Sequence, residues 1–317
     1  MLSPYSQRHM TKWLTACAVL ALAGASANGQ DPSGPPGSIV FYSAGNGHPN
    51  NQIYTMNPDG SDPKQVTFDT ASDVDPDISP DGKYIVFTSN QTGNNDIYIM
   101  NRSGATLDLT NNPANDEWAR FSPDGKRIVF DSNRDGGVFE IFVMNADGSG
   151  EPRQLTSPPT LGRYPSWSPD GKQIIFRRGI DIYVMNADGD GTPVQLTNEA
   201  PPSFAQMANF SPNGQYITFM SFREGYCSVF LMKSDGSGQT NLTPKDPADP
   251  STSWCSRAPA WSADGREIYF TSFRPSTSGQ SQVFVMNLDG RDVRQLTNSG
   301  TSGSARARRK VRQRPLE

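Results

Sequence analysis

The stretch from Phe121 to Thr156 reads FSPDGKRIVFDSNRDGGVFEIFVMNADGSGEPRQLT. It contains an apolar run, a Pro-Asp-Gly turn, a second apolar run that ends Met-Asn, an Asp-Gly turn and a closing Gln-Leu-Thr. The same order of features recurs along the chain, with Met-Asn-type strand ends at Met56, Met100, Met144, Met185, Met232 and Met286. Repeats of about 40–45 residues built from short strands are typical of four-stranded propeller blades. Six copies therefore predict an all-β, six-bladed β-propeller of antiparallel blades.

Each repeat contains a turn that joins its first strand to its second. In Ser122-Pro123-Asp124-Gly125, Pro supplies a φ of about −65°. Gly supplies the positive φ of a type I turn with a following bulge. Related tetrapeptides occur at residues 79–82, 168–171, 211–214 and 262–265. We interpret these turns as structural.

The strands of one blade can be read from their apolar runs. Second strands such as residues 127–130 are apolar without alternation, which fits strands that neighbouring blades cover on both faces. Short polar outer strands end in Leu-Thr, as suits an exposed edge. First strands carry a bulky residue before the turn, at Ile78, Phe121, Trp167, Phe210 and Trp261. We expect these residues to pack between blades; a ligand-stacking role for Trp167 or Trp261 is the alternative.

The first repeat begins with its second strand, at residues 38–41, so its innermost strand is missing from that place. Two arrangements are open. A poor strand near residues 304–308 closes the ring, or the first blade has three strands and the chain ends in a loose tail. Residues 298–317 contain six Lys and Arg against one Asp or Glu. This composition favours a basic, disordered tail, and the propeller is then expected at residues 38–297.

The N-terminal residues 1–27 have the features of a secretory signal peptide. Arg8 and Lys12 precede a short apolar run, and Ala25-Ser26-Ala27 supplies a small-x-small cleavage pattern. We expect cleavage after Ala27, a linker at residues 28–37, no transmembrane segment, and a periplasmic or secreted protein. Cys227 and Cys255 then remain in an oxidising environment, where a disulfide and two free buried thiols are both open.

The sequence contains few of the residues that enzymatic catalysis uses. The chain has only His9 and His48, of which His48 falls in a Gly/Asn/Pro-rich segment. A Ser-His-Asp triad cannot be assembled with a Gly-x-Ser-x-Gly elbow, and a His-rich metal site is excluded. Residues 28–297 hold 20 Lys and Arg against 31 Asp and Glu, which argues against a nucleic-acid partner. We predict a non-enzymatic protein without a cofactor.

Carboxylates offer one weak exception. Asp73, Asp75 and Asp77 alternate along one strand, and alternation sends them to one face, where Ca²⁺ could be held. The other interpretation is that these carboxylates accept hydrogen bonds from nearby backbone N–H groups.

A second set of residues lies four or five positions before the bulky residues. The set is Asp73, Asp116, Glu117, Arg163, Gln206 and Arg257. In a propeller these positions approach the mouth of the central channel. With Trp118 and Tyr164 nearby, they suit a polypeptide or polar-ligand site. The alternative is that they are solvated strand starts.

The repeats also resemble a known family. WSPDGK at residues 167–172, DIYVMNADG at 181–189 and QLT at 195–197 are similar to the WD40-like repeat of TolB-type six-bladed propellers. The resemblance covers Ser38 to Thr297. It implies an exported, monomeric, protein-binding module, with an envelope lipoprotein of the Tol-Pal type among the possible partners.

The α/β domain that precedes the propeller in TolB has no expected counterpart here. Two other functions stay open: a carboxylate-dependent glycan hydrolase or lyase, and a propeller accessory to a separate peptidase.

Overall fold

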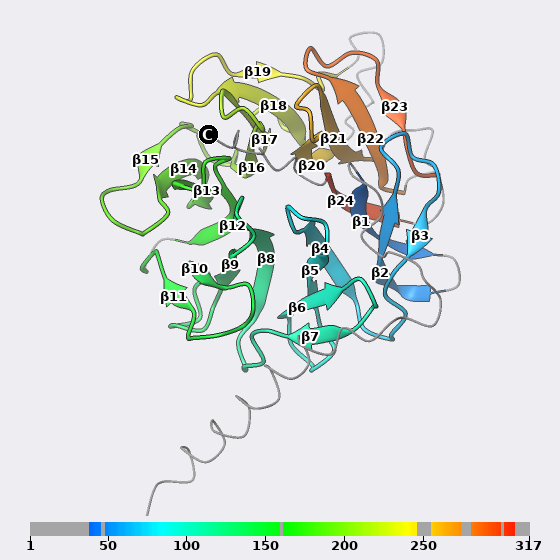
Figure 1. Cartoon of the computed structure of the whole chain (residues 1–317). Helices are drawn as coiled ribbons and strands as arrows, with labels where there is room; N and C mark the ends of the chain where they lie inside the picture. The colour runs from blue at the N-terminus through cyan, green and yellow to red at the C-terminus, as the bar shows by residue number, and fades with distance from the viewer. Residues whose placement is uncertain are drawn as a thin grey trace, which may run out of the picture.

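A computed structural model of the chain describes residues 38–45, 48–158, 161–245, 255–273, 280–298 and 301–307. These residues form six four-stranded antiparallel sheets, arranged as blades around a central axis (Figure 1). Strands and turns, without a helix, account for this part of the chain. The predicted all-β, six-bladed propeller is confirmed. The predicted signal peptide and linker lie outside the described residues.

The innermost strands surround the axis, one from each blade in the order of blades 2 to 6 and then 1. They are β4 (Asp73–Ile78), β8 (Asp116–Phe121), β12 (Gly162–Trp167), β16 (Ala205–Phe210), β20 (Ser256–Trp261) and β24 (Thr301–Ala307).

A bulge interrupts each of these inner strands at the same place. From β4 to β20 the register with the second strand shifts near the middle of the inner strand. The residue three positions before the bulky one has a φ between 50° and 58°, at Asp75, Trp118, Tyr164, Met207 and Ala258. Side chains rarely tolerate such a φ. Its recurrence shows that the bulge belongs to the blade, where it twists the strand and redirects its side chains.

The second and third strands form the middle of each blade. The second strands are β1 (Ile39–Gly45), β5 (Tyr84–Ser89), β9 (Arg127–Ser132), β13 (Gln173–Arg178), β17 (Tyr216–Ser221) and β21 (Glu267–Ser272). The third strands are β2 (His48–Met56), β6 (Asp96–Asn101), β10 (Glu140–Asn145), β14 (Asp181–Asn186), β18 (Ser228–Lys233) and β22 (Gln282–Asn287). His48 thus begins a strand. The apolar side chains of the second and third strands form clusters that span adjacent blades, as the runs without alternation predict.

The bulky residues of the inner strands pack between blades. Trp167 is fully buried, and its Nε1 donates to the carbonyl of Arg120 on the preceding blade at 3.1 Å. Trp261 makes the equivalent bond to the carbonyl of Asn209 at 3.1 Å. Burial leaves Trp167 no face on which a ligand could stack.

The Ser-Pro-Asp-Gly turns owe their geometry to the serine and aspartate side chains. The Ser122 hydroxyl donates to Asp124 Oδ1 at 2.5 Å and accepts the N–H of Arg127 at 2.9 Å. Gly125 has a φ of 72°, which a residue with a side chain rarely adopts. The same bonds recur in blades 4 and 6.

The outer strands are short, and the Leu-Thr pair that follows holds them in place. They are β3 (Lys64–Gln65), β7 (Thr106–Asp108), β11 (Arg153–Gln154), β15 (Val194–Gln195), β19 (Thr240–Asn241) and β23 (Arg294–Gln295). In blade 3 the Thr156 hydroxyl accepts the N–H of Ile141 and donates to the Glu140 carboxylate. Thr110 and Thr197 repeat this arrangement, so the threonine links each outer strand to the third strand.

The C-terminal strand β24 completes the first blade. The sheet order is β24-β1-β2-β3, and the red β24 lies beside the blue β1 in Figure 1. The prediction of a three-stranded first blade with a loose tail is therefore wrong for residues 301–307, and the ring-closing alternative is right. Small residues make this pairing possible: a Cβ at Gly303 would overlap the Tyr42 ring. Residues 308–317 lie outside the described residues.

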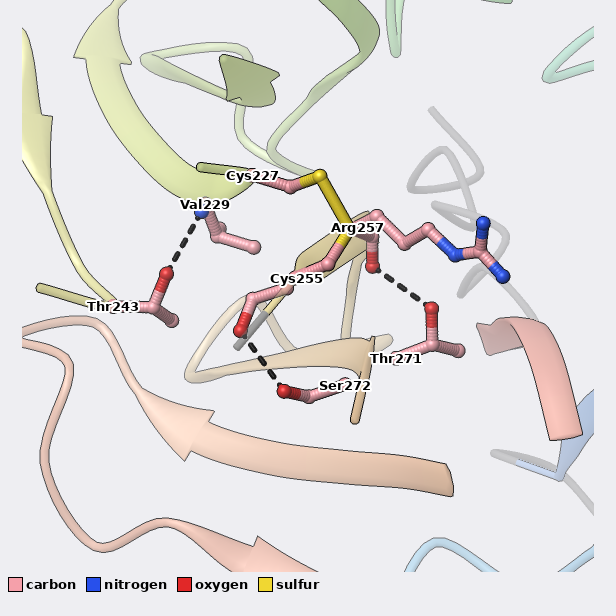
Figure 2. Close-up of a disulfide and its surroundings, with 8 residues drawn as sticks. Cys227, Val229, Thr243, Cys255, Arg257, Thr271 and Ser272 are labelled. Atoms are coloured by element: carbon pink, nitrogen blue, oxygen red, sulfur yellow. Dashed lines mark hydrogen bonds between the residues drawn. A yellow bond between two sulfur atoms is a disulfide. The ribbon is translucent and has the colours of Figure 1, made fainter. Parts of the chain in front are cut away.

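A disulfide joins blade 5 to the beginning of blade 6. Cys227 precedes β18 and Cys255 precedes β20, and the two are bonded with their Cα atoms 4.4 Å apart (Figure 2). Of the two alternatives that the sequence leaves open, the structure contains the bonded pair. Separately, no helix in the described ranges has the length and apolar character needed to cross a membrane.

Candidate binding site at the channel mouth

Four of the six predicted site residues lie together at one end of the channel. Glu117, Arg163, Gln206 and Arg257 are each the second residue of an inner strand, at the end opposite the Ser-Pro-Asp-Gly turns. We call this end the channel mouth. Glu117, Arg163 and Arg257 are half-buried and Gln206 is buried, so these positions are not simply solvated strand starts.

The other two predicted residues, Asp73 and Asp116, are fully buried. Asp116 accepts hydrogen bonds from Arg134 at 2.9 Å and from Asn112 at 2.6 Å, within blades 2 and 3. Burial raises the pKa of Asp73 to about 6, and neither of its carboxylate oxygens has a hydrogen-bond partner among the described residues. These two carboxylates lie inside the blades and do not line the mouth.

Two like-charge pairs lie side by side at the mouth. Glu117 of β8 is directly opposite Asp131 of β9, and Arg163 of β12 is directly opposite Arg177 of β13. Like charges opposite each other on antiparallel strands destabilise a sheet. Here Arg163 reaches across the blade boundary to Glu117 at 2.5 Å and to Asp131 at 3.2 Å. We call these four residues the mouth quartet.

Burial controls the protonation of Asp131. The side chain has no exposed surface, and desolvation raises its pKa to about 7, although the charge of Arg163 and the N–H of Tyr164 lower it. The Tyr164 N–H donates to Asp131 Oδ2 at 2.8 Å. Asp131 therefore changes its charge near neutral pH, beneath the guanidinium of Arg163.

Two arginines at the mouth have only neutral partners. Arg177 donates to Gln206 Oε1 at 2.7 Å and to the Gly179 carbonyl at 2.6 Å. Its guanidinium lies 5.2 Å from the centre of the Phe204 ring. Arg257 extends away from the disulfide, and only its backbone carbonyl accepts a bond, from Thr271 (Figure 2). Within the part of the chain that the structure describes, neither guanidinium contacts a carboxylate.

Aromatic rings adjoin these charges. Trp118 and Tyr164 occupy the positive-φ positions of β8 and β12, and their rings meet edge to face with centroids 4.7 Å apart. The Arg163 guanidinium lies 3.9 Å from the Phe139 ring centre and 5.0 Å from that of Tyr164. Arginine and aromatic side chains are enriched where proteins bind one another.

The predicted calcium face does not form. The bulge at Asp75, with a φ of 53°, breaks the alternation on which that prediction depends. Asp75 accepts a bond from Ser304 at 3.0 Å, whereas Asp77 accepts the N–H of Phe121 at 2.9 Å. Across the described ranges, no group of three or more His, Cys, Asp or Glu side chains could hold a metal ion.

The other end of the channel contains a cavity that the sequence analysis missed. It has a volume of about 580 Å³ and is lined by turn residues and by Asp77, Arg120, Asn209 and Arg306. Inside it, Arg120 donates to the Asp75 carbonyl at 3.0 Å, and Arg306 donates to Asn209 Oδ1 at 2.6 Å. One feature of the sequence points to these four residues. Each is a polar residue that directly precedes the last residue of an inner strand.

Comparison with known proteins agrees with this architecture. Residues 76–180 match the model of the TolB beta propeller domain. An uncharacterized protein of Agrobacterium fabrum is 31% identical over 90 residues, which span 28% of this chain and 27% of that protein. This chain therefore covers about a quarter of the length of that relative.

Solved structures extend the comparison to most of the chain. TolB from Acinetobacter baumannii matches with a TM-score of 0.71 and 22% identity, over 86% of this chain and 67% of that chain. A putative TolB from Agrobacterium tumefaciens matches with a TM-score of 0.66 and 22% identity, over 86% and 92% of the two chains. At these identities the matches establish a shared fold.

Proposed function

We propose that this chain, a TolB-like propeller by its repeats and its fold, is an exported, monomeric, non-enzymatic module that binds a protein partner at the channel mouth. Its place of action is the periplasm or the cell exterior. An envelope lipoprotein of the Tol-Pal type is the partner class that the TolB-like fold favours. This part of the proposal rests on likeness of fold.

The single observation that carries the proposal is the mouth quartet beside the Trp118–Tyr164 pair. Two like-charge pairs lower the stability of the sheets that contain them. The stability of the fold does not explain why these pairs lie at the channel mouth, next to aromatic rings. A partner segment that enters the mouth would contact charges and rings together, as the central residues of protein interfaces do.

The competing function is carboxylate-dependent cleavage of a glycan. It would need a protonated carboxylic acid and a carboxylate on opposite sides of the scissile bond. The raised pKa of Asp131, about 7, is the observation that favours it. Against it, Asp131 is fully buried beneath Arg163, and Glu117 is engaged by Arg163 and by Asn95 at 2.7 Å. Both carboxylates are thus occupied by protein donors.

The test compares capture of exported proteins by the full chain and by two variants. Arg163→Ala removes the centre of the quartet, and Arg291→Ala is the matched control, because Arg291 lies on an outer turn with a side chain that is 83% exposed. We expect a discrete partner to bind wild type and the control, and to be lost from Arg163→Ala. Equal capture by all three proteins would contradict a site at the mouth.

A glycan panel provides the second arm of the test. The wild type is assayed beside Asp131→Asn and Glu117→Gln. We expect no turnover by any of the three proteins. Turnover that either substitution abolishes would overturn the binding proposal in favour of the enzyme. Co-purification of a hydrolase that remains bound to Arg163→Ala would instead indicate a peptidase accessory that binds elsewhere.

A further inference from the structure

We infer that the segment bound at the channel mouth is acidic, and that its carboxylates pair with Arg177 and Arg257. This inference rests on the proposed function and adds the chemistry of the partner to it. It depends on how the arginines of the propeller are paired.

Three half-buried arginines in the described part of the chain have carboxylate partners. Arg134 stacks over Phe130 and Phe142 and pairs with Asp116 at 2.9 Å. Arg223 stacks over two phenylalanines in the same way and pairs with Glu199 at 2.6 Å. At the mouth, Arg163 pairs with two carboxylates. Each of these three guanidiniums has lost part of its water and has gained a negative charge in return.

Arg177, at the mouth, has no carboxylate partner among the described residues. It is half-buried against Phe204, and its protein partners are an amide oxygen and a backbone carbonyl, both neutral. Burial lowers its pKa, and the nearby Arg163 lowers it further. A cation without a counter-charge in such a place is less stable than in water. An incoming carboxylate would restore the missing charge.

Arg257 is the second such arginine at the mouth. It is half-buried, its guanidinium lies 5.3 Å from the Phe273 ring centre, and no carboxylate accepts from it in the described part of the chain. The disulfide at Cys255, two residues earlier, ties the start of β20 to blade 5 (Figure 2). The backbone that carries Arg257 is therefore fixed before a partner arrives, which reduces the entropy that binding would cost.

The charges around the mouth select the same class of partner. Three arginines, Arg163, Arg177 and Arg257, lie at the mouth, against the two carboxylates of Glu117 and Asp131. The mouth is thus locally positive, whereas residues 28–297 carry an excess of Asp and Glu. A basic or neutral segment would bury Arg177 and Arg257 without compensation. An acidic segment is attracted to these arginines and repelled by the excess of Asp and Glu in residues 28–297.

The experiment measures fluorescence anisotropy with two labelled peptides of equal length. One alternates Glu and Gly, and the other alternates Gln and Gly. The proteins are the wild type, Arg177→Gln/Arg257→Gln, and the control Arg291→Gln/Arg294→Gln on exposed outer turns and strands. Thermal unfolding of each protein verifies that it is folded.

We expect the Glu peptide to bind wild type and the control about tenfold more tightly than the Gln peptide, with loss of this preference in the mouth variant. Equal affinity for the two peptides, undiminished binding by the mouth variant, or no binding of the Glu peptide overturns the inference. A single-stranded DNA oligomer of equal charge serves as competitor, and stronger binding of the DNA than of the Glu peptide also overturns it.

Failure of this inference can be told apart from failure of the proposed function. A captured protein partner that depends on Arg163 but binds Arg177→Gln/Arg257→Gln normally would refute the acidic segment and leave the binding module intact. A partner independent of Arg163 would refute the site itself.

Discussion

Arg163 Nη2 lies 2.5 Å from Glu117 Oε2, although the two residues belong to different blades and are 46 positions apart in the chain. This contact offsets the repulsion between Glu117 and the Asp131 carboxylate opposite it. Together with the bond from Arg163 to Asp131, it supplies both carboxylates of one blade with a cation from the next. The boundary between blades 3 and 4 therefore depends on a charge network as well as on apolar packing.

Removal of Arg163 should destabilise the propeller. Arg163→Ala leaves Glu117 opposite Asp131 with no cation between them, and we expect the free energy of unfolding in urea to fall by about 2 kcal/mol. Glu117→Gln in the same background should restore about half of the loss, because it removes the remaining repulsion. An unchanged stability in Arg163→Ala would show that the network contributes nothing.

Asp131 should make stability depend on pH. Its pKa is about 7 in the folded protein against an ordinary value of 3.8, so the folded state binds the proton more tightly than the unfolded state does. The contribution of this tighter proton binding to the free energy of unfolding is fully present below about pH 3.8. It is lost as the pH rises to about 7. Asp73 acts in the same direction. Between these pH values the wild type should lose stability more steeply than Asp131→Asn, as measured by urea unfolding; parallel curves would contradict the assignment.

Ring closure should depend on the absence of a side chain at Gly303. Gly303→Ala forces a Cβ into the Tyr42 ring, and we expect a loss of about 1–3 kcal/mol in unfolding experiments. Tyr42→Ala should lower stability by itself, yet it should remove most of the additional cost of Gly303→Ala in the double variant. Strictly additive effects would indicate that the two residues are not in contact.

The disulfide should stabilise the junction of blades 5 and 6. The two cysteines are 28 positions apart in the sequence, and the bond restricts the unfolded chain over this loop. Cys255→Ser should therefore lower the free energy of unfolding by about 3 kcal/mol. The wild type treated with a thiol reductant should show the same loss, whereas Cys255→Ser should not respond to the reductant. A wild type that is insensitive to reduction would contradict a stabilising role.

The repeats predicted the blades well because each blade is specified locally. Pro-Asp-Gly turns, apolar runs and Leu-Thr ends act within one repeat, and Trp167 lies between blades as its position indicated. The closing strand was not predictable in the same way, because Gly303 and Ser304 carry no apolar pattern. Their pairing depends on a residue at the other end of the chain, Tyr42.

The candidate site was predicted in part for a related reason. Alternation places Asp116 and Glu117 on opposite faces of one strand, but no local signal says which face meets the channel. The bulge at Asp75 then changes the faces of the residues after it, so the set of three aspartates separates. Arg177 lies on a second strand, and it reaches the mouth because it pairs opposite Arg163 within its own blade.

The most direct test of the central claim is photo-crosslinking at two tyrosines. A benzoylphenylalanine at position 164 would lie at the channel mouth beside Trp118, and the same residue at position 216 would lie on an exposed strand start beyond the Ser-Pro-Asn-Gly turn. Irradiation in the presence of exported proteins should yield one discrete adduct from Tyr164 and none from Tyr216. Equal adducts from both positions, or none from Tyr164, would contradict a partner-binding mouth.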